Sequence, residues 1–428
     1  MSTTTATNGT GDTQDTQGTQ AREIVIAGAG YAGLHVALRL AARLNGRSDV
    51  RLTLVDRHSY HQILTELPRV AAGTRAAHDV RVPLERVLDR RVRFVQTAIS
   101  GFDFPGRRLL TEAGPIPYTH LVLALGSRPN DFGIPGIAER TLTLYSVEDA
   151  RRVLAAVEEQ VAAAVNERDP FEQRRRLTVV IGGGGATGVE LAGELAETMP
   201  ELARRHELPA DWCRIVLLDA GPTILAGSSP GLIGRANQIL ADLGVEVRTN
   251  AAIAEATERG FVLKGGEPIE GGVLVWAGGV KAPELIAGTG LEVGHNGRVK
   301  VDQYLRALDH PEISVAGDLA SVTNPETGRA YPPTAQIAIE EGETVANNLL
   351  AELEGREPEP FEYRDLGFVV SVGPRSGVAD MGGRAFGGRL AHVLKDAIEW
   401  EYRQSVKYLR GWTVVTHAAE LLPGDREH

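Results

Sequence analysis

REIVIAGAGYAGLHVALRLAARL, residues 22–44, is the stretch that decides the fold. It begins with a β-branched apolar run, continues with glycines at 28, 30 and 33, and ends with apolar residues at helical spacing. The pattern predicts a strand, a tight turn and a helix. In such a unit Gly28 permits the turn, Gly30 lets the backbone approach a pyrophosphate, and Gly33 lets helix and strand pack closely.

The next apolar run, VRLTLVD at residues 50–56, predicts a second strand that ends at Asp56. A carboxylate about 20 residues beyond the glycines suits hydrogen bonds from ribose hydroxyls. Glycine turns also occur for packing alone, but the strand, the helix and the terminal acid together favour a dinucleotide-binding unit.

The same unit occurs again at residues 177–188, LTVVIGGGGATG, with Gly183, Gly185 and Gly188. The strand that follows, RIVLLD, ends at Asp219. A carboxylate there would pair with a free 2'-hydroxyl and repel a 2'-phosphate, so NAD(H) is favoured over NADP(H). The structural alternative is that Asp219 only starts a turn.

Composition limits the classes of protein. The chain has 428 residues, of which 43% are hydrophobic, with 49 glycines, enough for roughly two to three domains. A formal net charge of -11 provides no basic field for nucleic acid. The one cysteine, Cys213, excludes a disulfide framework, a thiolate zinc site and a cysteine-ligated iron–sulfur cluster. Redox chemistry would therefore require a bound cofactor.

Residues 1–21, mostly Thr, Gly, Gln and Asp, predict a disordered tail without a secretory signal. No stretch approaches the roughly 18 uncharged apolar residues of a spanning helix. We therefore expect a cytoplasmic protein, with any membrane contact peripheral and at the inner face of the cell membrane.

A third element, ISVAGD at residues 313–318, predicts a short strand ending at Asp318, and a helix is expected from near Thr334 and Ala335. A carboxylate in this position can hold a ribityl hydroxyl, while the helix dipole meets an anionic flavin ring. Taken alone, Gly-Asp is a common turn.

The chain resembles the flavoproteins with two dinucleotide-binding domains and, among them, the type II NADH:quinone oxidoreductases. The resemblance rests on GAGYAGL at 28, LVDRHSYH at 54, YTHLVLALGSRPNDFGIPG at 118, IGGGGATGVELAGEL at 181, VWAGGV at 275, ISVAGD at 313 and TAQIAIEEG at 334. It implies that the first unit binds FAD through Gly28, Gly30, Gly33, Asp56, Asp318 and Ala335. The second unit would bind NADH through Gly183, Gly185, Gly188 and Asp219.

The implied fold is α/β, with two Rossmann-like dinucleotide-binding domains and a C-terminal α+β domain. We expect an FAD-binding domain at 22–146 and 281–350, an inserted NAD(H)-binding domain at 147–280, and a C-terminal membrane or interface domain at 360–428. EGREPEP at 354–360 is the expected separator.

Three further residues become candidates for the chemistry through this resemblance. Glu190 follows Gly188, where nicotinamide should stack, although its spacing with later glutamates also suits a solvated helix face. Gln336 could reach the flavin edge or an arriving carbonyl, or be an exposed helical glutamine. Lys395 matches a lysine near the quinone side of some bacterial members, although a surface lysine is the default interpretation.

The expected activity is transfer of two electrons from NADH through flavin to a quinone, without proton pumping, as in a respiratory chain. Glu340 stands where family members commonly have a second glutamine. The sequence therefore supports a quinone as electron acceptor less strongly than NADH as electron donor. The alternatives are a soluble reductase of a ferredoxin or rubredoxin-type carrier, and an NADH-sensing flavoprotein. A homodimer is left open.

The segment from Arg389 to about Arg410 predicts an amphipathic helix with a local excess of basic residues. We expect it to lie on the membrane surface, with its apolar face in the lipid interface and its basic side chains at the headgroups. Packing of the same face against the FAD-binding domain is the competing possibility. The basic residues are Arg389, Lys395, Arg403, Lys407 and Arg410, and the apolar ones Leu390, Val393, Leu394, Ala397, Ile398, Val406 and Leu409.

Overall fold

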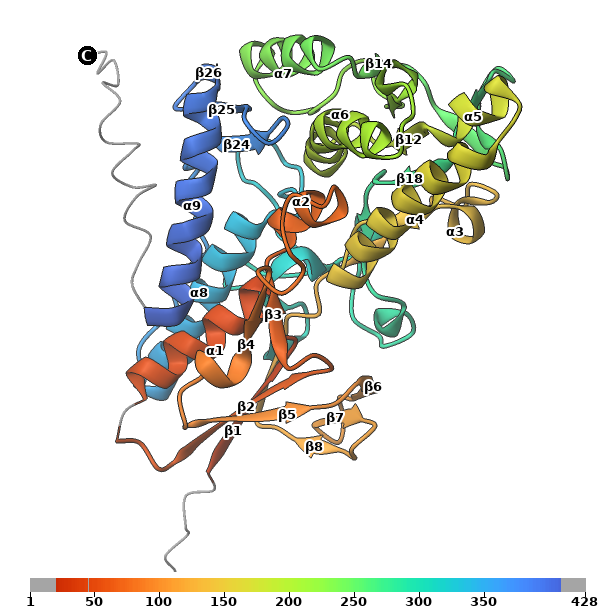
Figure 1. The fold of residues 1–428 in the computed structure, drawn as a ribbon. Coiled ribbons are helices and arrows are strands. Elements are labelled where there is room, and N and C mark those ends of the chain that lie inside the picture. The colour runs from red at the N-terminus through yellow and green to blue at the C-terminus, as the bar shows by residue number, and fades with distance from the viewer. Residues whose placement is uncertain (1–20, 45, 409–428) are drawn as a thin grey trace, which may run out of the picture.

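The computed structural model describes residues 21–44 and 46–408, and its lower half in Figure 1 is built on a six-stranded sheet. Every neighbouring pair is parallel except the first. The order is β21 (Arg306–Ala307), β22 (His310–Val315), β9 (His120–Leu123), β1 (Arg22–Ala27), β2 (Val50–Asp56) and β5 (Val92–Gln96). The central strands are buried on both faces, as a parallel sheet covered by helices requires.

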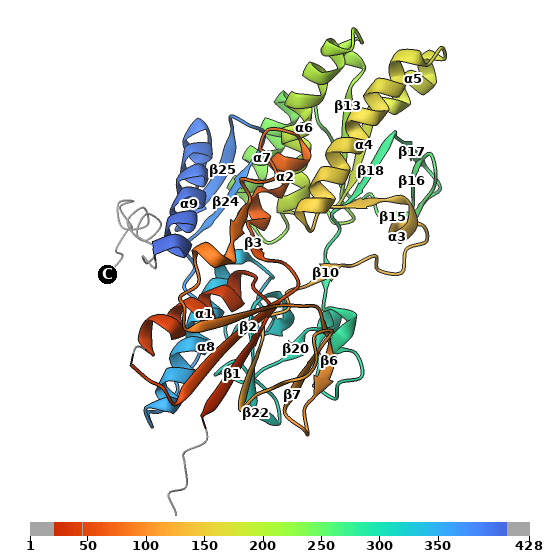
Figure 2. The same cartoon turned by 60° about the horizontal axis from the view of Figure 1, so that its bottom comes forward.

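Helix α1 (Tyr31–Arg43) directly follows the first glycine turn and packs against α8 (Ala335–Leu353), so both helices cover the same face of this sheet (Figure 2). The other side carries a small sheet of β6 (Ile99–Asp103), β7 (Arg108–Thr111) and β8 (Ile116–Pro117). Between β2 and β5 the chain forms β3 (Tyr60–Gln62), a short helical turn at Leu64–Glu66, α2 (Leu67–Ala71) and β4 (Arg81–Pro83).

A second parallel sheet forms the upper part of the molecule. Its order is β11 (Leu142–Thr143), β18 (Val273–Trp276), β12 (Thr178–Gly182), β13 (Arg214–Leu218) and β14 (Glu246–Arg248). The helices of this part are α3 (Ile137–Arg140), α4 (Val147–Asn166), α5 (Pro170–Arg176), α6 (Ala186–Arg205) and α7 (Pro230–Asp242). A three-stranded sheet consists of β15 (Ile253–Ala256), β16 (Gly260–Leu263) and β17 (Pro268–Glu270).

The chain crosses between the two parts on the antiparallel pair β10 (Arg128–Pro129) and β19 (Val280–Lys281). The division at residues 146 and 147 stays a prediction, and the pairing of β11 with β18 favours a crossing a few residues earlier. A further pair, β20 (Val299–Lys300) with β23 (Ala320–Ser321), lies in the returning segment. The two α/β units with parallel sheets confirm the predicted fold class.

The C-terminal part consists of β24 (Phe368–Ser371), β25 (Gly377–Met381), β26 (Arg384–Gly388) and the long helix α9 (Arg389–Tyr408). Both figures show α2 between α9 and α6. Leu409 and Arg410, which the sequence analysis counted in this helix, lie outside the described residues, as does nearly all of the predicted tail. None of the described helices is long and apolar enough to cross a membrane.

Candidate active site

The three glycines of the first unit have different surroundings. Gly28 has a φ of +108°, and a Cβ there would lie 2.2 Å from the Ala124 carbonyl oxygen. A Cβ on Gly33 would lie 1.9 Å from the Gly28 carbonyl oxygen. At Gly30 a Cβ would meet nothing within 4 Å. Two glycines are therefore required by the turn itself, whereas Gly30 leaves space above the loop.

Asp56, at the end of β2, accepts a hydrogen bond from the backbone of the first glycine loop. Its Oδ2 accepts a hydrogen bond of 2.8 Å from the Ala29 backbone N–H, and its Oδ1 accepts one of 2.8 Å from that of His58. Each carboxylate oxygen keeps a further lone pair. Asp56 can therefore orient the loop and still accept a ribose hydroxyl.

Asp318 lies at the carboxyl end of β22, beside the first glycine loop, and accepts a hydrogen bond of 2.7 Å from the Ser127 hydroxyl. Burial raises the pKa of its carboxyl. Behind it, Glu341 of α8 is fully buried and accepts a hydrogen bond of 2.6 Å from the Gly317 N–H. Burial raises the pKa of Glu341 to about 8. Glu341 therefore positions the Gly317–Asp318 turn from the protein interior.

These groups line one cavity of about 600 Å³. Segments far apart in the sequence contribute to it, namely both glycine units, the Asp318 turn, the first residues of α8, and α9; the lining includes Gly28, Gly30, Asp56, Gly126, Arg128, Tyr145, Thr187, Glu190, Asp318, Thr334, Ala335, Phe368 and Lys395. Open space over Gly30, a carboxylate after each of two strands, and a helix N-terminus fit a dinucleotide with a flavin ring.

The second glycine unit reproduces the first in detail. Gly183 has a φ of +120°, and a Cβ there would lie 2.3 Å from the Ala277 carbonyl oxygen, whereas at Gly185 it would meet nothing within 4 Å. Asp219 accepts hydrogen bonds of 2.7 Å from the N–H groups of Gly184 and Gly221. The bond from Gly221 is the turn that the structural alternative described, and the nucleotide role of Asp219 stays a prediction.

Glu190 does not lie on a solvated face. It is buried, and its Oε1 accepts hydrogen bonds from the Lys395 ammonium at 2.5 Å and from the Ser371 N–H at 3.1 Å. Burial works against the charge of Lys395, but the carboxylates of Glu190 and Glu399 outweigh it and raise its pKa. The solvated-face interpretation of Glu190 and the surface interpretation of Lys395 are therefore both wrong, because α2 and β24 pack against α6 and the Lys395 side chain of α9 reaches Glu190.

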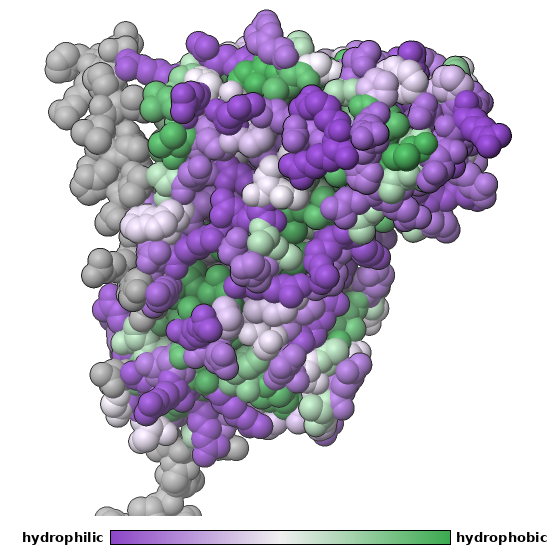
Figure 3. Space-filling view, in the orientation of Figure 1, coloured by the Kyte–Doolittle hydropathy of each residue, from purple (hydrophilic) through white to green (hydrophobic). Residues whose placement is uncertain are grey.

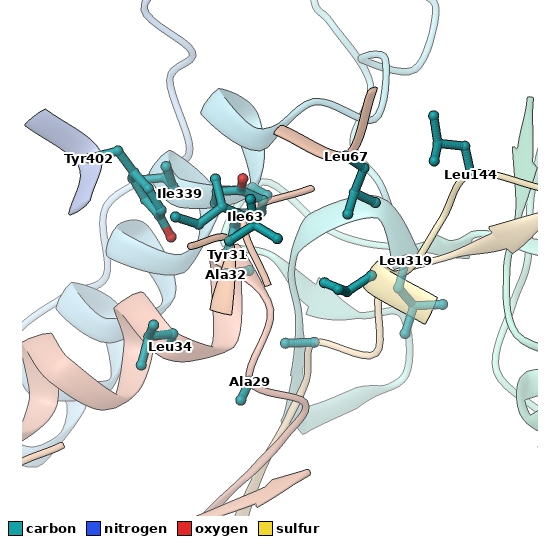
Figure 4. Packing of buried hydrophobic residues seen from close by; sticks show 14 of the residues in the cluster. Ala29, Tyr31, Ala32, Leu34, Ile63, Leu67, Leu144, Leu319, Ile339 and Tyr402 are labelled. Carbon is teal, nitrogen blue, oxygen red and sulfur yellow. The ribbon is translucent and has the colours of Figure 1, made fainter. Parts of the chain in front are cut away.

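The C-terminal helix also reaches the first glycine loop. His61 Nδ1 lies 3.0 Å from the Ala29 carbonyl oxygen, and its Nε2 lies 2.7 Å from the Tyr402 hydroxyl. Burial lowers the pKa of His61 to about 4, so the ring is neutral. Because a carbonyl can only accept, Nδ1 donates and Tyr402 donates to Nε2. Figure 4 shows Tyr402 pointing toward Tyr31, whose ring centroid is 5.0 Å away.

Gln336 stands next to the cavity lining, in the first turn of α8. Its amide nitrogen donates to Glu340 Oε1 at 3.1 Å and to the Arg364 carbonyl oxygen at 3.0 Å. Glu340 Oε2 in turn accepts from the Arg364 N–H at 3.1 Å. Burial raises the pKa of Glu340. Glu340, where this chain departs from the family pattern, therefore hydrogen-bonds to Gln336 and to the segment after α8. The role of Gln336 on the acceptor side stays a prediction.

Comparison with known proteins places this site in a family. Residues 22–342 match the family model described as pyridine nucleotide-disulphide oxidoreductase. The type II NADH:quinone oxidoreductase of Staphylococcus haemolyticus is 32% identical over 384 residues, which cover 88% of this chain and 94% of the relative. Its counterpart in Staphylococcus aureus is 33% identical over the same shares. The chain belongs to the type II NADH:quinone oxidoreductase family.

Solved structures agree in fold. NDH2 from Plasmodium falciparum in complex with NADH superimposes with a TM-score of 0.79 at 16% identity, covering 90% of this chain and 96% of that one. The sulfide:quinone oxidoreductase from Aquifex aeolicus gives 0.73 at 20% identity, covering 90% and 92%. The comparisons confirm the predicted family and the predicted cofactors, FAD and NAD(H). They also confirm that the protein is an oxidoreductase.

The lone cysteine separates this family member from thiol-dependent flavoproteins of similar fold. Cys213 is half-buried just before β13 and is not among the residues that line the cavity. Burial raises the pKa of its thiol to about 11, so it is protonated at neutral pH. It offers no thiolate to a flavin.

The sequence analysis missed several residues of the site. It assigned no role to Glu66, Arg69 or Glu341, and it did not predict that Glu194 is buried with Glu66 and Arg69 beside Glu190. The one available signal was the spacing of Glu190 and Glu194, one helical turn apart, which places both on the same face. That face proved to be the covered one.

Proposed function

We propose that this member of the family oxidises NADH and reduces a quinone, and that both reactants meet FAD in the cavity described above. The observation that carries the proposal is the convergence on one cavity of the first glycine loop, Asp318, the start of α8 and the Glu190–Lys395 pair. Bound FAD would supply the two-electron redox chemistry. The protein supplies position, charge and protons.

The start of α8 provides a positive field for an anionic ring. The Thr334 hydroxyl caps the helix by accepting from the Ile337 N–H at 3.3 Å, and Thr334, Ala335 and Ala338 line the cavity. The free N–H groups of a first helical turn and the helix dipole favour negative charge there. We assign this helix end to the ring edge of the flavin.

The Glu190–Lys395 pair holds exchangeable protons at the cavity wall. Lys395 is kept charged by Glu190 and Glu399 and can donate hydrogen bonds to a reduced acceptor. Glu190 can accept a proton and pass it on. We therefore place quinone reduction on the side of the cavity formed by α6 and α9, with Gln336 as a candidate contact of the quinone carbonyl.

The decisive experiment compares acceptors. We expect the purified, FAD-loaded protein to oxidise NADH rapidly with a water-soluble quinone and at least about tenfold more slowly with a ferredoxin-type carrier. A faster reaction with the carrier would favour the soluble reductase, whereas slow turnover with every acceptor and a long-lived reduced complex would favour the NADH sensor.

We also propose that α9 docks the protein on a membrane surface, through fewer of the apolar residues that the sequence analysis chose and with Trp400 in addition. Leu390, Val393 and Trp400 are 69%, 61% and 62% exposed and share one face of α9. Figure 3 shows apolar patches over the upper part of this helix. Val406 is buried and Lys395 is paired with Glu190, so neither can reach lipid. The corrected docking stripe is Leu390, Val393 and Trp400.

A flotation assay tests this stripe. The triple variant with serine at Leu390, Val393 and Trp400 should keep FAD and lose most binding to anionic liposomes at low salt. Phe171→Ser is the matched control, because Phe171 is 70% exposed on α5, on another part of the molecule. Equal binding by the triple variant and the wild type would contradict membrane docking through α9. Analytical ultracentrifugation would test the homodimer.

A further inference from the structure

A buried ionic cluster fills the junction where α2, α6 and α9 meet. Its buried members are Glu66, Arg69 and Glu194, and its more exposed edge consists of Asp396, Arg75 and Arg403. The side chains of Glu66 and Glu194 are fully buried, and that of Arg69 is 9% exposed. Buried charges are expensive to desolvate, so a cluster of this size calls for a reason beyond stability.

Glu194 contacts a residue at the protein surface, although its own side chain is fully buried. Its Oε2 lies 2.7 Å from the hydroxyl of Thr74, which is an exposed residue. Its Oε1 lies 3.7 Å from Arg69 Nε. The other charged groups around it are Glu190 and Glu197 on α6, Glu66 before α2, and Asp396 and Lys395 on α9.

The hydroxyl of Thr74 suits either protonation state of Glu194. It has one hydrogen and two acceptors in reach, Glu194 Oε2 and the Arg69 carbonyl oxygen at 3.1 Å. When Glu194 is ionised, Thr74 donates to it. When Glu194 is protonated, the carboxyl donates to Thr74 Oγ, and Thr74 donates to the Arg69 carbonyl. Neither state leaves a polar hydrogen of this pair unpaired.

Glu194 also stands one helical turn from the cavity wall. Residues four apart on a helix have Cβ atoms about 5–6 Å apart, so the carboxylates of Glu190 and Glu194 come within reach through a rotamer change. Ser371 contacts both Glu190 and the ionic cluster, because its N–H donates to Glu190 and its hydroxyl lies 3.5 Å from Arg69. The line from Thr74 to Glu190 therefore runs from solvent to the cavity.

We propose that Glu194 relays the solvent proton needed for quinone reduction, taking it up at Thr74 and passing it to Glu190. The proposal rests on the proposed function. NADH supplies a hydride, that is, two electrons and one proton equivalent, whereas a quinol carries two electrons and two protons. One proton per turnover must therefore come from water. Glu194 gives its proton to the Glu190 carboxylate, Glu190 gives one to the reduced acceptor oxygen, and water at Thr74 reprotonates Glu194.

The protonation equilibrium of Glu194 suits this task. Burial raises its pKa to about 7, with the charges of Glu190 and Glu197 adding to the effect and Thr74 and Arg69 opposing it. A relay group is most effective when its pKa lies near the working pH, because both forms are then populated. At neutral pH Glu194 can both give and receive a proton.

Glu194→Gln tests the relay, because glutamine keeps the shape and the acceptor oxygen but cannot transfer the proton. We expect turnover with a soluble quinone to fall at least tenfold. NADH oxidation by ferricyanide, a one-electron acceptor that takes up no proton, should fall at most twofold. FAD content should stay unchanged. Quinone turnover of the wild type should decline as pH rises through about 7, and the variant should lose this inflection.

Two further variants keep the test falsifiable. Thr74→Val, at an exposed position, should slow quinone turnover two- to threefold by hindering reprotonation, and Glu194→Asp should recover part of it. Glu201→Gln on the exposed part of α6 is the control and should match the wild type. Unchanged quinone turnover in Glu194→Gln, or an equal fall with both acceptors, would overturn the relay alone. A wild type that reduces ferricyanide but no quinone would overturn the function and the relay together.

Discussion

The two glycine loops are nearly copies of each other, yet they lie in different surroundings. In each unit the first glycine has a positive φ, the second opens onto free space, and an aspartate from the next strand accepts from the loop and from the residue two positions on. A loop of this kind is the usual pyrophosphate-binding element of a dinucleotide-binding unit. It does not decide which dinucleotide binds.

The difference lies in what is built around each loop. Beside the first lie Asp318, the start of α8, and Lys395 from α9. The contacts of the second loop come from its own sheet, with Ala277 below Gly183, Ile224 near Gly184, and the Trp276 ring against Gly182 and Gly278. We therefore propose that the first loop, which elements remote in sequence surround, binds the flavin nucleotide and that the second binds NAD(H).

The largest expected effect comes from Gly30→Glu. A Cβ at Gly30 meets no neighbour, so the variant should fold, but the carboxylate would occupy the space of the pyrophosphate and repel it. We expect loss of bound FAD and a fall of at least about a thousandfold in NADH oxidation. Flavin absorbance and circular dichroism check this, and a yellow, active variant would contradict the assignment of FAD to the first loop.

Gly185→Glu is the same change in the second loop and should act differently. The variant should keep FAD, because no part of that loop belongs to the proposed flavin contacts, while the KM for NADH rises about a hundredfold. Steady-state kinetics with a fixed quinone measures this. Loss of flavin from Gly185→Glu, with an unchanged KM, would mean that the two nucleotides have been assigned to the wrong loops.

A smaller effect separates the two aspartates. The wild type should prefer NADH over NADPH by at least about tenfold in kcat/KM, since Asp219 repels a 2'-phosphate. Asp219→Asn should reduce that preference to less than about threefold, whereas Asp56→Asn should leave it unchanged and weaken FAD retention. If the wild type and Asp219→Asn prefer NADH over NADPH equally, Asp219 is a turn residue and does not select the nucleotide.

The smallest expected effect concerns Glu341. This buried residue accepts a hydrogen bond from Gly317, beside the first glycine loop. Because its folded pKa is raised to about 8, the stability it contributes is present below its unfolded pKa and is lost as pH rises through 8. Glu341→Gln should therefore match the wild type near pH 5 and melt about 2–4 °C higher at pH 9. Thermal melts of FAD-loaded protein across this range check the sign. A lower melting temperature at pH 9 would contradict it.

Much of the fold could be predicted because its signals are local. The glycine spacing and the strand-ending acids require only neighbours in the chain, and both units appear where the sequence placed them. Predictions that depended on a partner element fared worse. Glu190 and Glu194 have the spacing of a solvated helix face, but α2 and β24 pack against α6, and Lys395 of α9 pairs with Glu190. The spacing of polar residues along a helix does not show whether the face that they form is exposed to water or covered by another element.

The sequence by itself determined two dinucleotide loops, their order, the absence of reactive thiol pairs and the family resemblance, because each is carried by residue types at short, fixed spacings. Only the tertiary structure decided that Lys395 faces Glu190 rather than lipid, that Trp400 joins the exposed stripe, and that Glu194 is buried beside Thr74. The reason is physical. Burial and pairing of charge depend on which distant segment packs against a side chain, and that is fixed only when the two sheets and α9 come together.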